Sequence, residues 1–155
     1  MEGWRPATVD DLPRLAELAA QAVAEQRQSK GGEVWARREA RQAPFEARLA
    51  AELASAATAV LVGTLDDAVL GYGVAVVEAL PDGGRLGVVT DLYVEPGGRE
   101  VGIGETLMQA LVDWCAAEGC FGVDSLALPG DRATKNFFES FGLVARGIIV
   151  HRKLT

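Results

Sequence analysis

The stretch that decides the fold is Val94-Glu95-Pro96-Gly97-Gly98-Arg99-Glu100-Val101-Gly102-Ile103-Gly104. It follows a β-rich run and precedes a helical pattern that places Leu107 and Leu111 on one face. A helix start offers unpaired backbone N–H groups and a partial positive charge, and glycine lets a ligand approach the backbone closely. The stretch therefore predicts a strand-to-helix junction that binds an anion, most often a phosphate.

Two common phosphate-binding motifs do not fit this junction. A P-loop requires Lys and then Ser/Thr after its second glycine, where this chain has Ile103 and Gly104. A dinucleotide fingerprint requires a third glycine where this chain has Leu107, and it belongs at a first βα turn. A dinucleotide-binding oxidoreductase is therefore the least favoured of the functions considered.

The patterns on either side of the junction predict an α+β (mixed α/β) fold in a single domain, residues 1–155. The expected order is β-α-α-β-β-β-α-β-α-β, in which three strands form an antiparallel meander before the junction. Pro44 is expected to divide or kink the second helical region. The expected elements are strands at 4–8, 58–65, 69–77, 85–94, 121–128 and 143–154, and helices after Asp10 and at 33–56, 102–118 and 131–141.

Composition narrows the class of protein. Apolar residues make up 49% of the 155 residues and charged residues 24%, which excludes a disordered chain. The net charge of −7 disfavours nucleic acid and anionic membranes as partners. There is no transmembrane run and no signal-peptide pattern, so we expect a cytoplasmic protein. Cys115 and Cys120 are expected to be reduced, and with His151 as the single histidine no metal site is expected.

The string Val-x-Pro-x-x-Arg-x-x-Gly-x-Gly, placed after a β meander and before an amphipathic helix, resembles the acyl-CoA loop of the GNAT acetyltransferase superfamily. Residues 4–8 resemble the first strand of that family. Residues 131–143 resemble its last helix, whose usual form is Asn-x-x-Ala-x-x-Phe-Tyr-x-x-x-Gly-Phe. The resemblance covers essentially the whole chain and implies a central, mostly antiparallel sheet.

The resemblance implies acetyl-CoA as cosubstrate, without a metal. The helix start would bind the pyrophosphate, the preceding strand would pair with the pantetheine arm, and a bulge would splay that strand from the next one. The cofactor-binding residues that it implies are Leu92, Tyr93, Val94, Arg99, Glu100, Val101, Gly102, Ile103, Gly104, Glu105, Thr106, Asp131, Asn136 and Phe138.

Two residues are candidates for catalysis. By resemblance, the Val94 amide would polarise the thioester carbonyl while an amine attacks directly. A protonated amine needs a proton acceptor, and Asp91 is the first candidate because it shares a strand face with Tyr93. Asp91 as a substrate anchor or a solvated acid, Glu95, and a chain of waters remain alternatives.

The chain departs from the family pattern in its last helix. Phe138 stands where the family has a tyrosine that acts as general acid, and Asp131 stands where an asparagine is usual. A phenyl ring cannot donate a proton. We therefore expect an N-acetyltransferase acting on a primary amine, favouring a small cationic molecule, with a protein N-terminus or lysine as alternative acceptor. A non-catalytic acyl-CoA-binding module is the other alternative, and the resemblance leaves a homodimer open.

Overall fold

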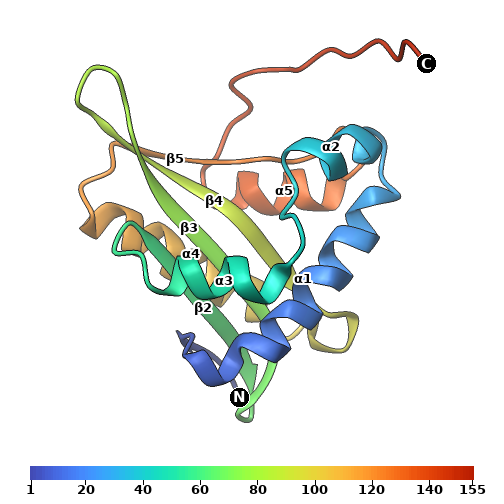
Figure 1. The fold of residues 1–155 in the computed structure, drawn as a ribbon. Coiled ribbons are helices and arrows are strands. Elements are labelled where there is room, and N and C mark those ends of the chain that lie inside the picture. Colours follow the sequence, from blue (N-terminus) through green and yellow to red (C-terminus); the bar gives the residue numbers. More distant parts are fainter.

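A five-stranded sheet forms the centre of the computed structural model, which describes all 155 residues (Figure 1). The strands lie in chain order, and neighbours are antiparallel except for the parallel last pair. The strands are β1 (Glu2–Pro6), β2 (Thr58–Leu65), β3 (Ala68–Ala79), β4 (Arg85–Val94) and β5 (Gly122–Ser125). The expected α+β fold and its antiparallel meander are confirmed.

Helices cover both faces of this sheet. Helices α1 (Leu12–Arg27) and α3 (Phe45–Leu53) contact one face, whereas α4 (Ile103–Ala117) crosses the other and contacts all five strands. Pro44 divides the second helical region as expected, because it separates α2 (Gly32–Arg38) from α3. The remaining elements are η1 (Val9–Asp11), η2 (Pro96–Gly98) and α5 (Arg132–Ser140). None of the helices is long and apolar enough to cross a membrane.

Successive side chains of a strand point to opposite faces of the sheet, and this divides the core into two clusters. Val60 and Val62 of β2 pack with α1 and α3, and Leu61 between them packs with α4. This is the two-residue period of a strand buried on both faces. The helix α4 therefore packs on its own face of the sheet, in a cluster separate from that of α1 and α3. The loop of residues 94–104 leads into the N-terminus of α4.

Three strand glycines let α4 lie close to the sheet. A Cβ on Gly63 would come within 2.5 Å of the Ile103 side chain, and one on Gly87 within 2.5 Å of Cys115. Gly73 lies between them, where a Cβ would be 2.8 Å from Leu111. These glycines form a row across β2, β3 and β4 under one helix, a role that the sequence analysis did not assign to them.

The expected terminal strand at 143–154 is wrong. After α5 the chain forms no further strand, and every residue from Val144 to Thr155 is exposed. A strand needs a neighbouring strand to satisfy its backbone groups, and these residues make no backbone hydrogen bond with the rest of the chain. High strand propensity was therefore not sufficient to predict a strand here.

Candidate functional site

A cleft opens where β4 and β5 separate. The two strands pair only from Leu86–Gly122 to Val89–Ser125. Immediately beyond, the register with β3 shifts, because Val74 pairs with Asp91 and Ala75 with Val89, which leaves Thr90 as an extra residue. Such a bulge bends a strand. The second half of β4, residues 91–94, therefore has β3 on one side and no strand on the other.

The backbone of Val94 points to this open side. The Glu95 amide donates to the Leu70 carbonyl at 2.9 Å, and hydrogen-bonded and non-bonded pairs alternate along an antiparallel ladder. Val94 and Gly71 are the next pair, so the N–H and C=O of Val94 point away from β3. The carbonyl accepts a hydrogen bond from Arg99 Nε at 2.8 Å. The strand thus presents the Val94 N–H at the cleft.

The loop after β4 carries a run of free backbone donors. None of the N–H groups from Glu100 to Glu105 donates a hydrogen bond within the protein, and the first helical bond runs from Thr106 N to Gly102 O at 3.0 Å. Gly102 has a left-handed φ of 87° and is the N-cap residue of α4. Five of these six residues, all except Val101, line a cavity of about 170 Å³ that Val94 and Phe137 also line. Free amides at a helix start favour an anion.

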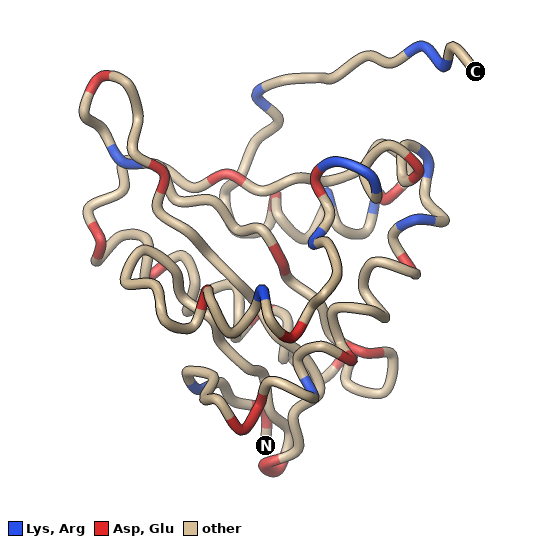
Figure 2. Tube along the Cα trace, viewed as in Figure 1, with Lys and Arg blue, Asp and Glu red and all other residues tan.

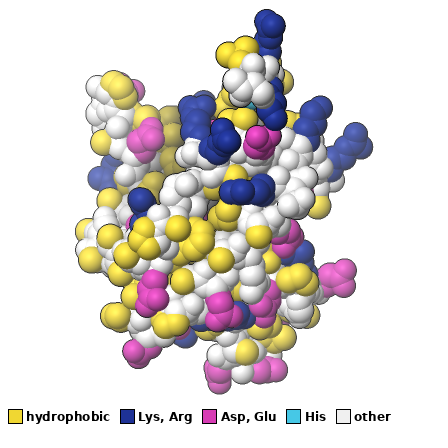
Figure 3. Space-filling model, turned by 45° about the vertical axis from the view of Figure 1, so that its right-hand side comes forward, with side chains coloured by type: hydrophobic (Ala, Val, Ile, Leu, Met, Phe, Trp, Pro, Cys, Tyr) yellow, Lys and Arg dark blue, Asp and Glu magenta, His cyan; other side chains and the backbone are white.

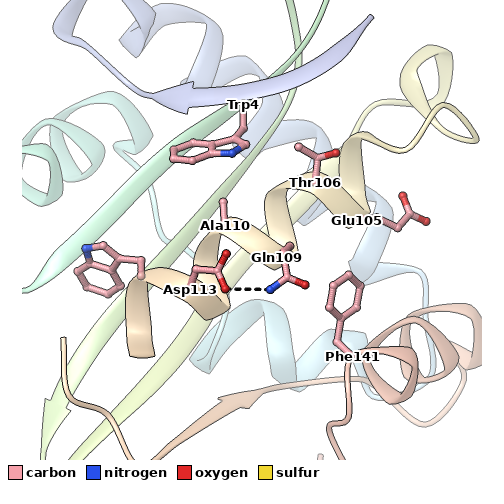
Figure 4. A pocket seen from close by; sticks show the side chains of 8 residues that line it. Trp4, Glu105, Thr106, Gln109, Ala110, Asp113 and Phe141 are labelled. Carbon is pink, nitrogen blue, oxygen red and sulfur yellow. Dashed lines mark hydrogen bonds between the residues drawn. The ribbon is translucent and has the colours of Figure 1, made fainter. Parts of the chain in front are cut away.

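A larger hollow lies elsewhere on α4. It measures about 690 Å³, and Figure 4 shows it across the outer face of the helix, between Trp4 of β1 and Phe141 after α5. Its polar lining includes Gln109, which donates to Asp113 at 2.9 Å. Glu105 lines both hollows. Because neither Val94 nor the glycine loop borders the larger hollow, we take the smaller cavity as the candidate site.

The last helix supplies a different aromatic residue from the one expected. Phe137 lines the loop cavity, while Phe138 is 8% exposed and lies in the α4 cluster of the core. Asp131 is the N-cap of α5, where it accepts hydrogen bonds from the Thr134 amide at 3.1 Å and hydroxyl at 2.6 Å. Neither Asp131 nor Asn136 lines the cavity.

The carboxylate of Asp91 is already occupied by four donors. Arg41 donates from Nε and Nη2, both at 2.9 Å, and the hydroxyls of Tyr72 and Thr90 donate at 2.7 Å. The Asp91 side chain is 9% exposed and that of Arg41 is 8% exposed. Arg41 also pairs with Glu52 of α3. This arrangement indicates that Asp91 holds Arg41 in place, and it disfavours the predicted role of Asp91 as the catalytic base.

Burial and charge raise the pKa values of Tyr72 and Arg41 in this cluster. Burial raises the pKa of the Tyr72 phenol well above its usual value, and the neighbouring Asp91 raises it further, so the phenol stays a donor. Burial alone would lower the pKa of Arg41, but hydrogen bonds with Glu52 and Asp91 outweigh it and the net shift is upward. Arg41 therefore remains a cation in the interior. Sequence alone could not have found this cluster, since Arg41 lies 50 residues from Asp91.

A second acidic group lies beside the cleft. Glu25, near the end of α1, accepts hydrogen bonds from Tyr93 at 3.0 Å and from Arg99 Nη2 at 2.9 Å. Its side chain is 50% exposed. The same Arg99 guanidinium also donates to the Val94 carbonyl. Arg99 therefore links Glu25 to the open edge of β4. Burial, and then the bond to Glu25, raise the pKa of Tyr93.

Comparison with known proteins agrees with this geometry. The family profile described as the acetyltransferase (GNAT) family matches residues 20–143, and the chain belongs to this family. A search of curated proteins finds no match to the sequence.

Solved structures show the same fold at low sequence identity. The tetramutant of a Bacillus halodurans protein is 21% identical to this chain. Its TM-score is 0.80, and the match covers 97% of this chain and 99% of that protein's chain. An aminoglycoside acetyltransferase from an uncultured soil metagenomic sample is 22% identical, with a TM-score of 0.72 over 99% and 95%. Glucosamine-6-phosphate N-acetyltransferase from Arabidopsis thaliana is 17% identical, with a TM-score of 0.72 over 100% and 99%.

Proposed function

We propose that this chain is an acetyl-CoA-dependent N-acetyltransferase that acts on a primary amine. The observation that carries the proposal is the run of six free amides, Glu100 to Glu105, beside the open edge of β4. A pyrophosphate needs several N–H donors at a helix start, and an extended amide-containing arm needs an unpaired strand edge. Both requirements are met next to each other.

The residues present fit coenzyme A. The amides of residues 100–105 would hold its pyrophosphate, and the β4 backbone at residues 92–94 would pair with its pantetheine arm. Phe137, which lines the loop cavity, would supply apolar contact. When bound, acetyl-CoA supplies an activated acetyl thioester. Glu100 does not oppose the anion in this scheme, because its side chain is exposed to solvent.

The chemistry then depends on two groups at the cleft. The Val94 N–H would donate a hydrogen bond to a carbonyl oxygen and stabilise the negative charge that develops on it. An amine is mostly protonated at neutral pH and must lose a proton before it attacks. We assign the proton-acceptor role to Glu25, because its carboxylate lies beside the open edge and is half exposed, whereas that of Asp91 is buried and saturated.

The acceptor is a small cationic amine in this proposal. A carboxylate at the cleft and the net charge of −7 favour a cation. Acidic residues are spread over the body of the trace in Figure 2 and are not gathered at the cleft, so Glu25 is a more specific indication than net charge. Among structures of the same fold, the named acceptors include an aminoglycoside, glucosamine-6-phosphate and a ribosomal-protein alanine, so a protein N-terminus is the alternative acceptor.

The first test separates an enzyme from a module that only binds acyl-CoA. We expect purified protein to bind CoA in calorimetry and to release free thiol from acetyl-CoA faster when small amines are added. Peptides with a free N-terminus and peptides with an internal lysine form the second arm of the panel. Binding of CoA without acceleration by any amine or peptide would leave the non-catalytic module, which the burial of Phe138 at the tyrosine position favours.

A pair of carboxamide variants tests the proton acceptor. Glu25→Gln is expected to lower kcat/KM at neutral pH by about 100-fold, since general base catalysis is typically worth 10²–10⁴. Asp91→Asn is expected to lower the melting temperature and to keep the parental shape of the pH–rate profile. The assignment is wrong if Glu25→Gln keeps the parental rate while Asp91→Asn removes the dependence on pH.

A further inference from the structure

The larger hollow on the outer face of α4 has no part in the proposed function. Its volume of about 690 Å³ lies within the usual range for small-molecule sites. Figure 4 shows Trp4 on one side of the helix and Phe141 on the other, with Gln109 and Asp113 between them. The hollow therefore has the size and the walls of a separate binding site.

Aromatic residues from three parts of the chain line this hollow. Trp4 of β1 pairs with Gly63 of β2, and cross-strand partners share a face of the sheet. A Cβ on Gly63 would contact the Ile103 side chain of α4. Trp4 is therefore on the α4 face, where it is 47% exposed. Trp114 of α4 and Phe141, which follows α5, are half-buried and complete the aromatic lining.

The polar lining is acidic and has no cation beside it. Glu105, Gln109 and Asp113 are spaced four residues apart, so they form one row along α4. Neither Glu105 nor Asp113 takes part in an ion pair, and Asp113 accepts a hydrogen bond from the neutral Gln109. Most Lys and Arg side chains visible in Figure 3 lie in its upper half, around α2 and the C-terminal segment, and none lines the hollow.

We propose that the larger hollow binds a small organic cation, a substituted ammonium, and that this cation is an effector of CoA binding. Aromatic faces attract cations, and quaternary ammonium groups are recognised in this way. The carboxylates of Glu105 and Asp113 add the opposite charge. A neutral apolar ligand would remove water from both carboxylates without replacing it, and an anion would be repelled by them.

Two features join the larger hollow to the loop cavity. Glu105 lines both. Phe141 of the hollow packs against Phe137 of the loop cavity, with their ring centroids 5.2 Å apart. A cation beside Glu105 would offset negative charge close to the amides that hold the CoA pyrophosphate. The cation is therefore expected to favour CoA binding, and CoA to favour the cation by the same factor. This coupling rests on the proposed function, whereas binding of the cation does not.

Choline is the probe for the first test, because its quaternary nitrogen has no N–H and cannot be acetylated as an amine acceptor. Calorimetric titration of the full chain with choline is expected to show saturable binding. The neutral alcohol in which a tert-butyl group replaces the trimethylammonium group has the same shape and is expected not to bind. Absence of choline binding, or equal binding of the two compounds, would overturn the proposal.

Two variants of the hollow locate the choline. Trp4→Leu keeps an apolar side chain but removes the ring, and Asp113→Asn removes one charge. Each is expected to weaken choline binding by about fivefold. Asp10→Asn is the matched control, because Asp10 is also exposed and forms no ion pair but lies in η1. It is expected to keep the parental affinity. Choline binding that survives both changes in the hollow would place the cation elsewhere and refute the assignment.

A CoA titration in saturating choline tests the coupling. The affinity for CoA is expected to rise by about threefold, which is the size that exposed charges allow. If choline binds in the hollow and the affinity for CoA stays the same, the cation is not an effector. If CoA does not bind at all, the proposed function and the coupling fail together, whereas the choline titration still decides whether the hollow is a cation site.

Discussion

Replacing Gly102 with tryptophan is expected to weaken CoA binding by about tenfold or more, which corresponds to about 1.4 kcal/mol. Gly102 begins α4 with a φ of 87° and lines the loop cavity. A Cβ on Gly102 would already lie 3.6 Å from the Glu2 side chain, so an indole has to displace either that side chain or the helix start, and the cavity of about 170 Å³ has no room for an indole and a phosphate together. Calorimetric titration with CoA measures the effect directly.

A glycine at the opposite end of the same helix provides the control. Gly119 also has a left-handed φ, 79°, and a Cβ there would meet nothing within 4 Å. Gly119→Trp therefore imposes a similar backbone strain, of about 1–3 kcal/mol, without touching the loop. If both variants melt at similar temperatures and only Gly102→Trp loses affinity, the anion site is at the loop. Equal affinity of the two variants for CoA would move the site elsewhere.

Local pattern was sufficient to predict the loop and most of the fold. The run from Val94 to Gly104 encodes strand end, turn and helix start within one short segment, so its geometry needed no distant partner. The same holds for Pro44, whose missing N–H and fixed φ exclude it from a helix interior, so that α3 begins only after it. Most elements whose signals are carried by neighbouring residues were therefore predicted correctly, and the terminal segment is the exception.

Features made by residues far apart in the chain were not predictable. Glu25 meets Arg99 across 74 positions, and nothing in either local sequence indicates that contact. Gly63 and Gly87 were overlooked for the same reason, because their function is defined by a helix that crosses them. The prediction of a terminal strand was wrong for a related reason. The local pattern of residues 143–154 is that of a strand, but no neighbouring strand pairs with them.

The two departures from the family pattern, Asp131 and Phe138, are explained by what surrounds each residue in the fold. Asp131 satisfies the first turn of α5 with hydrogen bonds to Thr134, which explains why an acid is tolerated where an amide is usual. Phe138 is buried among the residues that pack on α4, so its contribution is packing. Adding a hydroxyl there would bury a polar group rather than place a proton donor at the loop cavity.

Replacing Arg41 with methionine is expected to cost about 3–5 kcal/mol of folding free energy, as is typical when one partner of a buried ion pair is removed. The variant leaves the carboxylates of Asp91 and Glu52 without their shared cation. Hydrogen bonds from Tyr72 and Thr90 to Asp91 would remain, but they carry no positive charge. Denaturant unfolding measures the loss, and the melting temperature should fall by roughly 10 °C.

Arg38 gives the matched control for this change. It lies three residues earlier, its side chain is 71% exposed, and its one ion pair joins it to Glu39 at 3.8 Å. Arg38→Met is expected to change stability by no more than about 0.5 kcal/mol. A loss in Arg41→Met no larger than that of Arg38→Met would show that the cluster is not an anchor.

A triple variant separates lost charge from lost packing. Arg41→Met combined with Glu52→Gln and Asp91→Asn removes both carboxylates that the single change leaves unpaired. Because the penalty comes chiefly from those uncompensated charges, the triple variant is expected to recover at least about half of the lost stability. If it stays as unstable as the single variant, Arg41 stabilises the fold by packing its side chain between α3 and β4, and Asp91 becomes available again as a base.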